Sequence, residues 1–336
     1  MEPGYTLLIF TGIIGTIVGF WKIYQTPWFI QNILHSHKEQ TEDILKQLYH
    51  VLQSGQTASF HAMAGALSIS KKKLLALVEE MSKSGLVRVQ DDKLELTDSG
   101  KKYALKIVRV HRLWEKYLSE KTGFHPSEWH DIAEKKEHRL NKEEVIKLNQ
   151  ALGHPRFDPH GDPIPTETGE IISPDWIPLP TLKAEQKAKI VHIEDEPETI
   201  YRQIIGRRLH RGSQLKIIDS NDKQVIFESE GLKHKLSPIV ASNINVEILS
   251  EQEVYESTAV RLSSLCTGEK GRVLTISSES RGAARRRLLD LGFVSGTEVE
   301  VAFENPLEEP KAYLIRNTLV ALRKNQAEYI LIEKIV

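Results

Sequence analysis

Imidazole and carboxylate side chains recur at helical spacing in one short stretch of this chain. Residues three and four positions apart share a face of an α-helix, so these groups would point into one small volume. Neutral imidazole and carboxylate ligands, without a thiolate, suit divalent ions such as Mn(II), Fe(II) or Zn(II). The alternative is a solvated, charged helix face, which would explain any single residue but not the recurrence. The set comprises His111, Glu115, His130, Glu134, Glu137 and His138.

Catalysis is one alternative for such a cluster, because a metal ion with an open coordination position activates water. The sequence contains no nucleophile triad, no P-loop and no Gly-x-Gly-x-x-Gly pattern. It also carries no signature of a substrate pocket. We therefore expect a metal-binding protein that is not an enzyme.

The composition narrows the class of protein further. A chain of 336 residues with 40% hydrophobic residues is long enough for two or three packed domains. The net charge of -1 creates no global field that would attract nucleic acid, so DNA binding would need a local basic patch. The single cysteine, Cys266, excludes a disulfide framework and fits a reducing compartment.

The N-terminal stretch differs from the rest of the chain. Residues 3–21 carry no charge and, at roughly 1.5 Å per residue, would cross about 28 Å, near the hydrocarbon thickness of a bilayer. A cleaved signal peptide and a buried soluble helix are the alternatives, but the start lacks the positive region of a signal peptide. Lys22 and Lys38 follow the stretch while only Glu2 precedes it. We expect a single-pass anchor in the inner (cytoplasmic) membrane, with the soluble part in the cytoplasm.

The elements that would position the metal-type residues follow from periodicity. Apolar spacing predicts helices over 41–49, 59–67 and 70–84, and two short alternating runs around Asp91-Asp92 predict a hairpin. Three helices followed by a hairpin is the order of a winged helix-turn-helix. A long helix capped by Thr97 would then carry the first metal-type pair.

The C-terminal half has a different character. The segment 154–165 is dense in proline and glycine and predicts a turn-rich linker. Residues 176–249 and 258–336 are both rich in strands, and each has a turn signal before a strand. Two small β-barrels, related by a diverged duplication, are the natural interpretation.

Several motifs in fixed order resemble the diphtheria-toxin-repressor family of metal-dependent transcriptional regulators. They are TEDILKQLY, SGLVRV, ELTDSGKKYA, VHRLWEKYL, WHDIAEKKEH and GHPRFDPHGDPIP. The C-terminal segments are similar to the FeoA-like, SH3-like barrel, the second more closely through RRLLDLGFVSGTEVEV. Together these features imply an α+β chain with five parts. They are a transmembrane anchor (1–37), a winged helix-turn-helix (38–104), a helical dimerisation and metal-binding domain (105–170) and two SH3-like β-barrels (171–252 and 253–336).

The resemblance implies two sites for Mn(2+) or Fe(2+). One would use Asp43, Glu134, Glu137 and His138, and the other would use His111, Glu115 and His130. In the manganese-sensing branch His111 would join the first group, so both partitions stay open.

The ligand types bear on the choice of metal and of partition. Carboxylates at Asp43 and Glu134 replace the sulfur ligands of iron sensors and favour Mn(II). Lys46 replaces an acidic ligand of the manganese branch and favours two separated sites. Glu196 and Glu198 are weaker candidates, for which solvated loop acids are the alternative.

The resemblance also implies a homodimeric repressor of metal-uptake genes that binds a palindromic DNA operator. Its metal would stabilise the DNA-competent state over a looser one. The DNA contacts would come from Ser70, Lys71, Lys72 and Lys73 at the start of the recognition helix. Lysines there can hold phosphates but do not read the base sequence, and the leucines that follow offer bases no hydrogen bonds.

A second function stays open because of the anchor and the FeoA-like segments. The chain would then be a membrane-bound metal-sensing module that regulates a metal transporter without sequence-specific DNA binding. The basic run Arg281, Arg285, Arg286 and Arg287 is interpreted as a solvated helix face.

Overall fold

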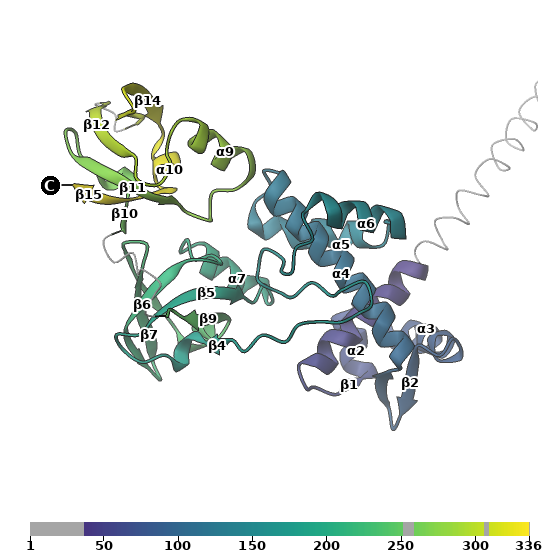
Figure 1. Cartoon of the computed structure of the whole chain (residues 1–336). Helices are drawn as coiled ribbons and strands as arrows, with labels where there is room; N and C mark the ends of the chain where they lie inside the picture. The colour runs from purple at the N-terminus through teal and green to yellow at the C-terminus, as the bar shows by residue number, and fades with distance from the viewer. Residues whose placement is uncertain (1–36, 251–258, 306–308, 336) are drawn as a thin grey trace, which may run out of the picture. The chain divides into compact units, whose positions relative to one another are not determined.

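The computed structural model of the chain describes residues 37–250, 259–305 and 309–335, which are coloured in Figure 1. These residues divide into two compact units. The first holds the described residues up to Val108 together with Glu167–Gly169, and the second holds Arg109–Thr166 and the described residues from Glu170 onward. The predicted membrane anchor lies outside the described residues except for its last position. Within the described ranges, no helix is both long and apolar enough to cross a membrane.

The first unit contains three helices followed by an antiparallel hairpin, which is the order predicted for a winged helix-turn-helix. Its core includes the wholly buried Leu45, Leu48 and Leu74. Asp91 and Asp92 both have positive φ, as the tight two-residue hairpin turn requires. The sheet has the order β1-β3-β2. The elements are helical residues 37–53, β1 (Ala58–Ser59), α2 (Phe60–Ala66), α3 (Lys71–Lys83), β2 (Val87–Gln90) and β3 (Lys93–Leu96).

The long helix α4 (Asp98–Lys121) begins where the sequence predicts it. The hydroxyl oxygen of Thr97 accepts a hydrogen bond from the amide of Gly100 at 3.0 Å, which confirms the predicted cap. Gly100 also packs tightly on the hairpin, because a Cβ there would lie 1.9 Å from the carbonyl oxygen of Leu86. This close approach fixes the start of α4 against the strand that follows α3.

Short helices follow α4 in the second unit. A 3-10 turn, η1 (Pro126–Glu128), leads into α5 (Trp129–Glu137), and α6 (Lys142–Ala151) comes next. The predicted turn-rich segment 154–165 then leads toward the first sheet. Two arginines of α4 hold it, since Arg112 donates to the carbonyl oxygen of Pro163 at 2.7 Å and Arg109 donates to that of Pro165.

Two β-domains complete the second unit, residues 177–248 (the first β-domain) and 259–335 (the second β-domain) (Figure 1). The first contains β4 (Ile177–Pro178), η2 (Leu179–Thr181), β5 (Lys187–Ile193), α7 (Glu198–Ile205), β6 (Gln214–Asn221), β7 (Gln224–Ser229), β8 (Leu232–Leu236), α8 (Pro238–Ala241) and β9 (Ile244–Ile248). The second contains β10 (Ala259–Arg261), η3 (Leu262–Ser264), β11 (Lys270–Ile276), α9 (Gly282–Asp290), β12 (Glu298–Glu304), β13 (Lys311–Ile315), β14 (Thr318–Leu322), α10 (Lys324–Ala327) and β15 (Ile330–Ile335).

The two β-domains share one strand order, which supports the predicted duplication. The sheets run β4-β9-β5-β6-β7-β8 and β10-β15-β11-β12-β13-β14. Closed barrels are not what the structure shows. In the described part of each domain, the first and last strands of the sheet do not pair, and the edge strands β4 and β10 are only two and three residues long.

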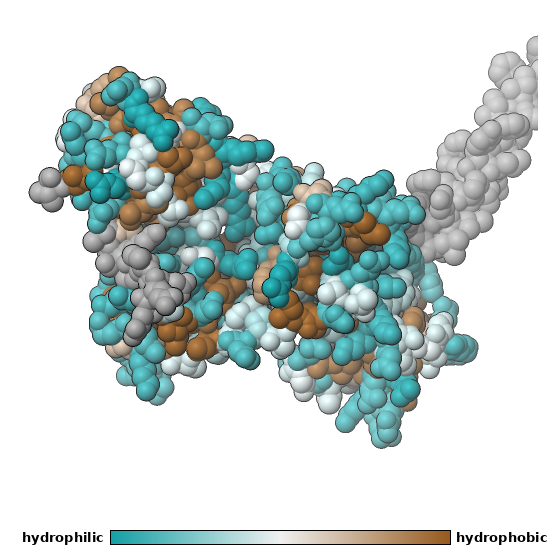
Figure 2. Space-filling view, in the orientation of Figure 1, coloured by the Kyte–Doolittle hydropathy of each residue, from teal (hydrophilic) through white to brown (hydrophobic). Residues whose placement is uncertain are grey.

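Each β-domain has a core of its own. Phe227 and Leu215 are wholly buried in the first, and Phe293 and Val301 are wholly buried in the second. Figure 2 shows hydrophobic residues among the hydrophilic ones on the viewed face of the second β-domain. Single exposed apolar side chains such as Phe303 are normal on protein surfaces.

Candidate metal centre

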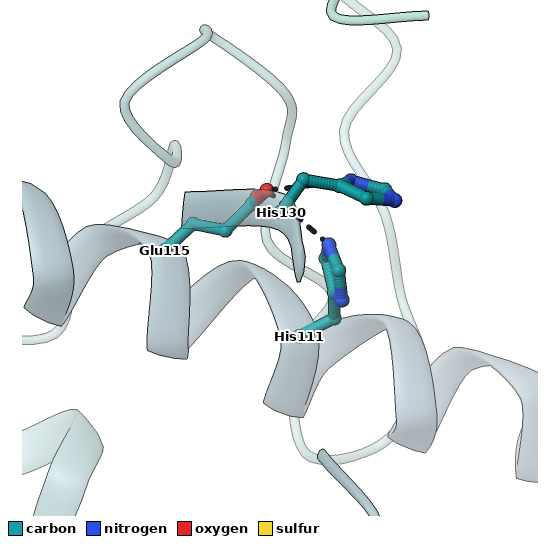
Figure 3. A group of neighbouring side chains, drawn as sticks. All are labelled: His111, Glu115 and His130. Atoms are coloured by element: carbon teal, nitrogen blue, oxygen red, sulfur yellow. Dashed lines mark ion pairs between the residues drawn. The ribbon is translucent and has the colours of Figure 1, made fainter. Parts of the chain in front are cut away.

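Helices α4 and α5 bring three predicted ligands together. His111 and Glu115 lie one turn apart on α4, and His130 is the second residue of α5. The Oε1 atom of Glu115 lies 3.2 Å from Nε2 of His111 and 3.7 Å from Nδ1 of His130, as the dashed lines in Figure 3 mark. One potential ligand atom from each residue lies within 4.8 Å of the others. The predicted second group therefore forms one cluster of side chains.

The local sequence explains why His130 faces α4. His125 and Glu128 form a reciprocal capping box that starts η1 just before α5. Trp129 is 2% exposed, and its indole nitrogen donates to the carbonyl oxygen of Phe124 at 3.1 Å. The buried tryptophan anchors the first turn of α5, and the neighbouring His130 is held beside the carboxylate of Glu115.

Glu115 is a buried, ionised carboxylate. Its residue is 2% exposed, and among the described residues its Oε1 has no hydrogen-bond partner of good geometry. Burial alone would raise the pKa of Glu115, but the neighbouring imidazoles of His111, His130 and His160 hold it well below its usual value. A buried anionic oxygen surrounded by imidazole nitrogens is suited to receive a cation.

Two further residues, which the sequence analysis missed, belong to this cluster. The Nε2 atom of His160 lies 3.8 Å from Oε1 of Glu115, and Oδ2 of Asp195 lies 3.3 Å from Nδ1 of His130. Glu115, His160 and Asp195 themselves form a group able to hold a metal. His160 is 4% exposed, and its Nε2 has no hydrogen-bond partner within the described ranges. Two buried, unsatisfied ligand atoms thus face the same space.

The fold of segment 154–165 places His160. One carboxylate oxygen of Asp158 accepts the amides of His160, Gly161 and Asp162 at 2.8–2.9 Å, which closes a tight turn. Gly161 has φ +111°, and a Cβ there would lie 2.2 Å from the carbonyl oxygen of Val191 on β5. The segment is therefore more than the linker that the sequence predicts, because its turn presents a metal-type side chain.

Charge pairs surround this turn. Arg112 of α4 lies 2.9 Å from Oδ1 of Asp162 and 3.9 Å from Oδ2 of Asp158. Burial, joined by the negative charges of Asp162 and Glu115, raises the pKa of Asp158 well above its usual value. For Asp162, burial would raise the pKa, but the charges of Arg112 and His192 and the hydrogen bond with His192 together lower it. Opposite shifts in two neighbouring carboxyls reflect their different partners.

Glu137 and His138 lie beside the first cluster. Oε2 of Glu137 is 2.5 Å from Nδ1 of His111, and Oε1 is 3.5 Å from Nε2 of His138. Both residues are buried. His111 therefore contacts ligand candidates of both predicted groups, and either partition stays compatible with its position.

The remaining predicted ligands are less enclosed. Glu134 is half-exposed, and its carboxylate lies 3.5 Å from Nε2 of His130. Asp43 is half-buried on the helix of residues 37–53 in the first unit, and its membership of the centre stays a prediction. Of the weaker candidates, Glu196 lies 3.8 Å from His130, whereas Glu198 pairs with Arg202 on α7 at 2.5 Å.

The predicted DNA-contacting residues occupy the start of α3. The hydroxyl of Ser70 caps the helix by accepting the amide of Lys73 at 3.3 Å, and the three lysines that follow it are exposed. Leu74 and Leu77 are buried in the core of the first unit, so packing explains them. Leu75 is 45% exposed and remains on the outer face.

Comparisons with known proteins identify two domains of the chain. Residues 97–166 match the model of the iron dependent repressor, metal binding and dimerisation domain, and residues 260–334 match the FeoA domain. A probable metal transport system membrane protein of Chlamydia trachomatis serovar D is 43% identical over 88 residues, which is 26% of this chain and 20% of that protein. The diphtheria toxin repressor of Corynebacterium diphtheriae is 28% identical over 222 residues, covering 63% of this chain and 98% of that protein.

A solved structure agrees with these matches. A manganese-dependent transcriptional repressor in complex with manganese has a TM-score of 0.55 and 27% identity, covering 62% of this chain and 100% of that one. The manganese belongs to that protein, and the likeness to this chain rests on fold and sequence together. The chain therefore contains an iron-dependent-repressor type metal-binding and dimerisation domain followed by a FeoA domain, and it is similar to the diphtheria toxin repressor over 63% of its length.

Proposed function

We propose that this chain is a homodimeric transcriptional repressor that binds DNA when it holds Mn(2+) or Fe(2+). The observation that carries the proposal is the enclosed cluster of Glu115, His111 and His130, with His160 and Asp195 beside it. Carboxylate and imidazole ligands without sulfur fit Mn(2+) and Fe(2+). The unsatisfied atoms of Glu115 and His160 would be satisfied by a cation. The solved neighbour is a manganese-dependent transcriptional repressor, and the Corynebacterium diphtheriae relative is a repressor.

The origin of the ligands suggests how the metal would act. His111 and Glu115 come from α4, His130 from α5, and Asp195 from the stretch between β5 and α7 of the first β-domain. A bound ion would hold these parts of the second unit in one arrangement. Its binding energy would favour that arrangement over a looser one, as an effector requires.

DNA contact would come from the first unit. The exposed Lys71, Lys72 and Lys73 at the capped start of α3 would hold phosphates. A palindromic operator would match a two-fold dimer of such units. Genes for metal uptake are the proposed targets, because metal-dependent repression of uptake closes a feedback loop.

A gel-shift experiment with the full chain in detergent tests this function. DNA from the chain's own upstream region is titrated with protein, with and without Mn(2+). We expect a shift that needs the metal and that is lost when Lys71, Lys72 and Lys73 are all changed to Gln. Lys135→Gln, an exposed lysine on α5, is the matched control. Metal binding without any metal-dependent shift would refute the repressor.

The second candidate is a membrane-bound module that regulates a metal transporter. The likeness to a metal transport system membrane protein over 88 residues favours it. An anchor at residues 1–37 would place the soluble part on the cytoplasmic side of the inner membrane. Alkaline carbonate extraction of membranes tests the anchor, because an integral protein stays in the pellet while a chain lacking residues 1–37 is released.

A further inference from the structure

Basic side chains make up half of the lining of a cleft in the second unit. It encloses about 470 Å³ where the end of α4, segment 154–165 and both β-domains meet. Among the described residues of its lining, Glu120 is the one carboxylate, and it is paired with Lys116 at 3.0 Å. The basic lining residues are Lys116, Lys121, Arg211, Arg281, Arg285 and Arg286.

Two of the arginines are held at the cleft by aromatic rings and backbone rather than by carboxylates. Arg281 lies over the ring of Trp129 at 4.8 Å and donates to the carbonyl oxygen of Ser278 at 3.0 Å. Arg211 lies over the ring of Phe157 at 5.2 Å and donates to the carbonyl oxygen of Val191 at 3.1 Å.

These guanidinium groups are partly buried, and in the described residues no carboxylate lies in direct contact with them. Burial lowers the pKa of both Arg211 and Arg281. In the part of the chain that the structure describes, neither they nor Arg285 form an ion pair with a carboxylate within 4.0 Å. Two like charges held together and partly desolvated are unfavourable unless an anion joins them.

The N-terminus of α9 lines the same cleft, through Gly282. Within the described ranges no side chain caps this end, and the first turn of the helix contains no acidic residue. Ser280, just before the helix, lines the cleft and is 3% exposed, and among the described residues its hydroxyl oxygen has no hydrogen-bond partner. Helix amide ends favour anions, and an enclosed hydroxyl without a partner needs a ligand group.

We propose that this cleft binds a small phosphate-bearing molecule. Arginine and lysine side chains together with helix amides form the donor set that phosphate oxygens accept. The volume exceeds what one phosphate fills and lies in the range of sites for small organic ligands. Several cations on different walls fit a ligand with more than one phosphate. The cleft would give this regulator an input separate from its metal centre.

The sequence analysis interpreted the run of arginines as a solvated helix face. That interpretation holds for Arg287, which is exposed and does not line the cleft. Arg281 and Arg285 are half-buried, and Arg285 also donates to the carbonyl oxygens of Ile276 and Ser277. The same helix therefore supplies both a test residue and a matched control.

Isothermal titration of the full, metal-free chain with pyrophosphate, at constant ionic strength, tests the proposal. We expect saturable binding of one pyrophosphate per chain, tighter than that of inorganic phosphate. Arg285→Gln and Lys121→Gln should each weaken binding at least tenfold, while Arg287→Gln should leave it within twofold. Lys121 is exposed, so its variant keeps the test valid if an arginine variant fails to fold.

Three results would overturn the proposal. The first is no saturable binding of pyrophosphate at millimolar concentration by the folded chain. The second is an equal loss in Arg287→Gln and Arg285→Gln, which would indicate general charge attraction. The third is binding of a short DNA duplex that Arg285→Gln weakens while pyrophosphate fails to compete, which would assign the cleft to a nucleic-acid backbone.

Discussion

Glu115→Gln should remove most of the metal affinity while keeping the shape of the side chain. Glu115 is 2% exposed, and its Oε1 lies 3.2 Å, 3.7 Å and 3.8 Å from nitrogens of His111, His130 and His160. The substitution replaces the central anion by a neutral amide. Loss of an outer partner of a ligand already costs about 10–100-fold in affinity. We therefore expect a loss of at least about 100-fold, or about 2.7 kcal/mol, for this direct ligand.

The same loss of Mn(2+) affinity determines how much less the metal stabilises the folded chain. At a free Mn(2+) concentration of about 100 times the dissociation constant, the metal stabilises the folded chain by about 2.7 kcal/mol. A 100-fold weaker site at the same concentration leaves about 0.4 kcal/mol. The metal-induced rise in unfolding temperature should therefore nearly vanish in Glu115→Gln.

Isothermal titration with Mn(2+) measures the affinity, and thermal unfolding with and without Mn(2+) measures the linked stability. Glu143→Gln removes one exposed carboxylate from the first turn of α6 and serves as the matched control. It should bind Mn(2+) like the unchanged chain. An affinity of folded Glu115→Gln within threefold of the control would refute the assignment of Glu115 as a ligand.

Four further predictions follow from the contacts and charges of the structure. His160→Gln should weaken Mn(2+) binding about tenfold or more in the same titration, because His160 offers an unsatisfied nitrogen to the cluster, and unchanged affinity would exclude it as a ligand. Burial alone would lower the pKa of His130, but Asp195, Glu115 and Glu134 raise it to about 12. A metal that binds His130 at neutral pH must therefore displace a proton. Mn(2+) affinity should then rise with pH, by about tenfold per pH unit for each proton released, and titrations in buffers of different ionisation enthalpy count those protons. Because the folded pKa of His130 lies above its unfolded value of 6.5, its ion pairs should stabilise the metal-free chain fully below about pH 6.5 and less as the pH rises toward 12. Gly100→Ala should destabilise the first unit by more than about 2 kcal/mol in denaturant unfolding, because its Cβ would meet the Leu86 carbonyl oxygen at 1.9 Å. Gly65→Ala in α2, where a Cβ would meet open space, should raise the free energy of unfolding by up to about 1 kcal/mol. Equal effects of the two changes would contradict the close packing of Gly100 on Leu86.

Helical spacing was enough to predict the pairing of His111 with Glu115, because both lie on one helix. The repeated pattern on two successive helices also predicted that His130 would lie near this pair. His160 and Asp195 could not be found in this way. They are 45 and 80 residues beyond Glu115 in the chain. Their positions depend on the turn closed by Asp158 and on the close packing of Gly161 against β5, which no periodicity records.

The burial and contacts of single side chains also could not be predicted from the sequence. Leu74 and Leu77 weakened the DNA-binding interpretation until the structure placed them in a core. The arginine run of α9 has both a half-buried face and an exposed face, and composition cannot separate them. The prediction of closed barrels failed because strand count and alternation do not determine whether the first and last strands pair.

Anomalous diffraction at the manganese edge, from crystals of the full chain grown with Mn(2+), tests the metal centre most directly. We predict a peak in contact with Oε1 of Glu115 and with ring nitrogens of His111 and His130. The distances from metal to ligand atoms should be about 2.0–2.3 Å. Manganese bound elsewhere on the chain, with no peak beside Glu115, would contradict the assignment of this cluster as the metal centre.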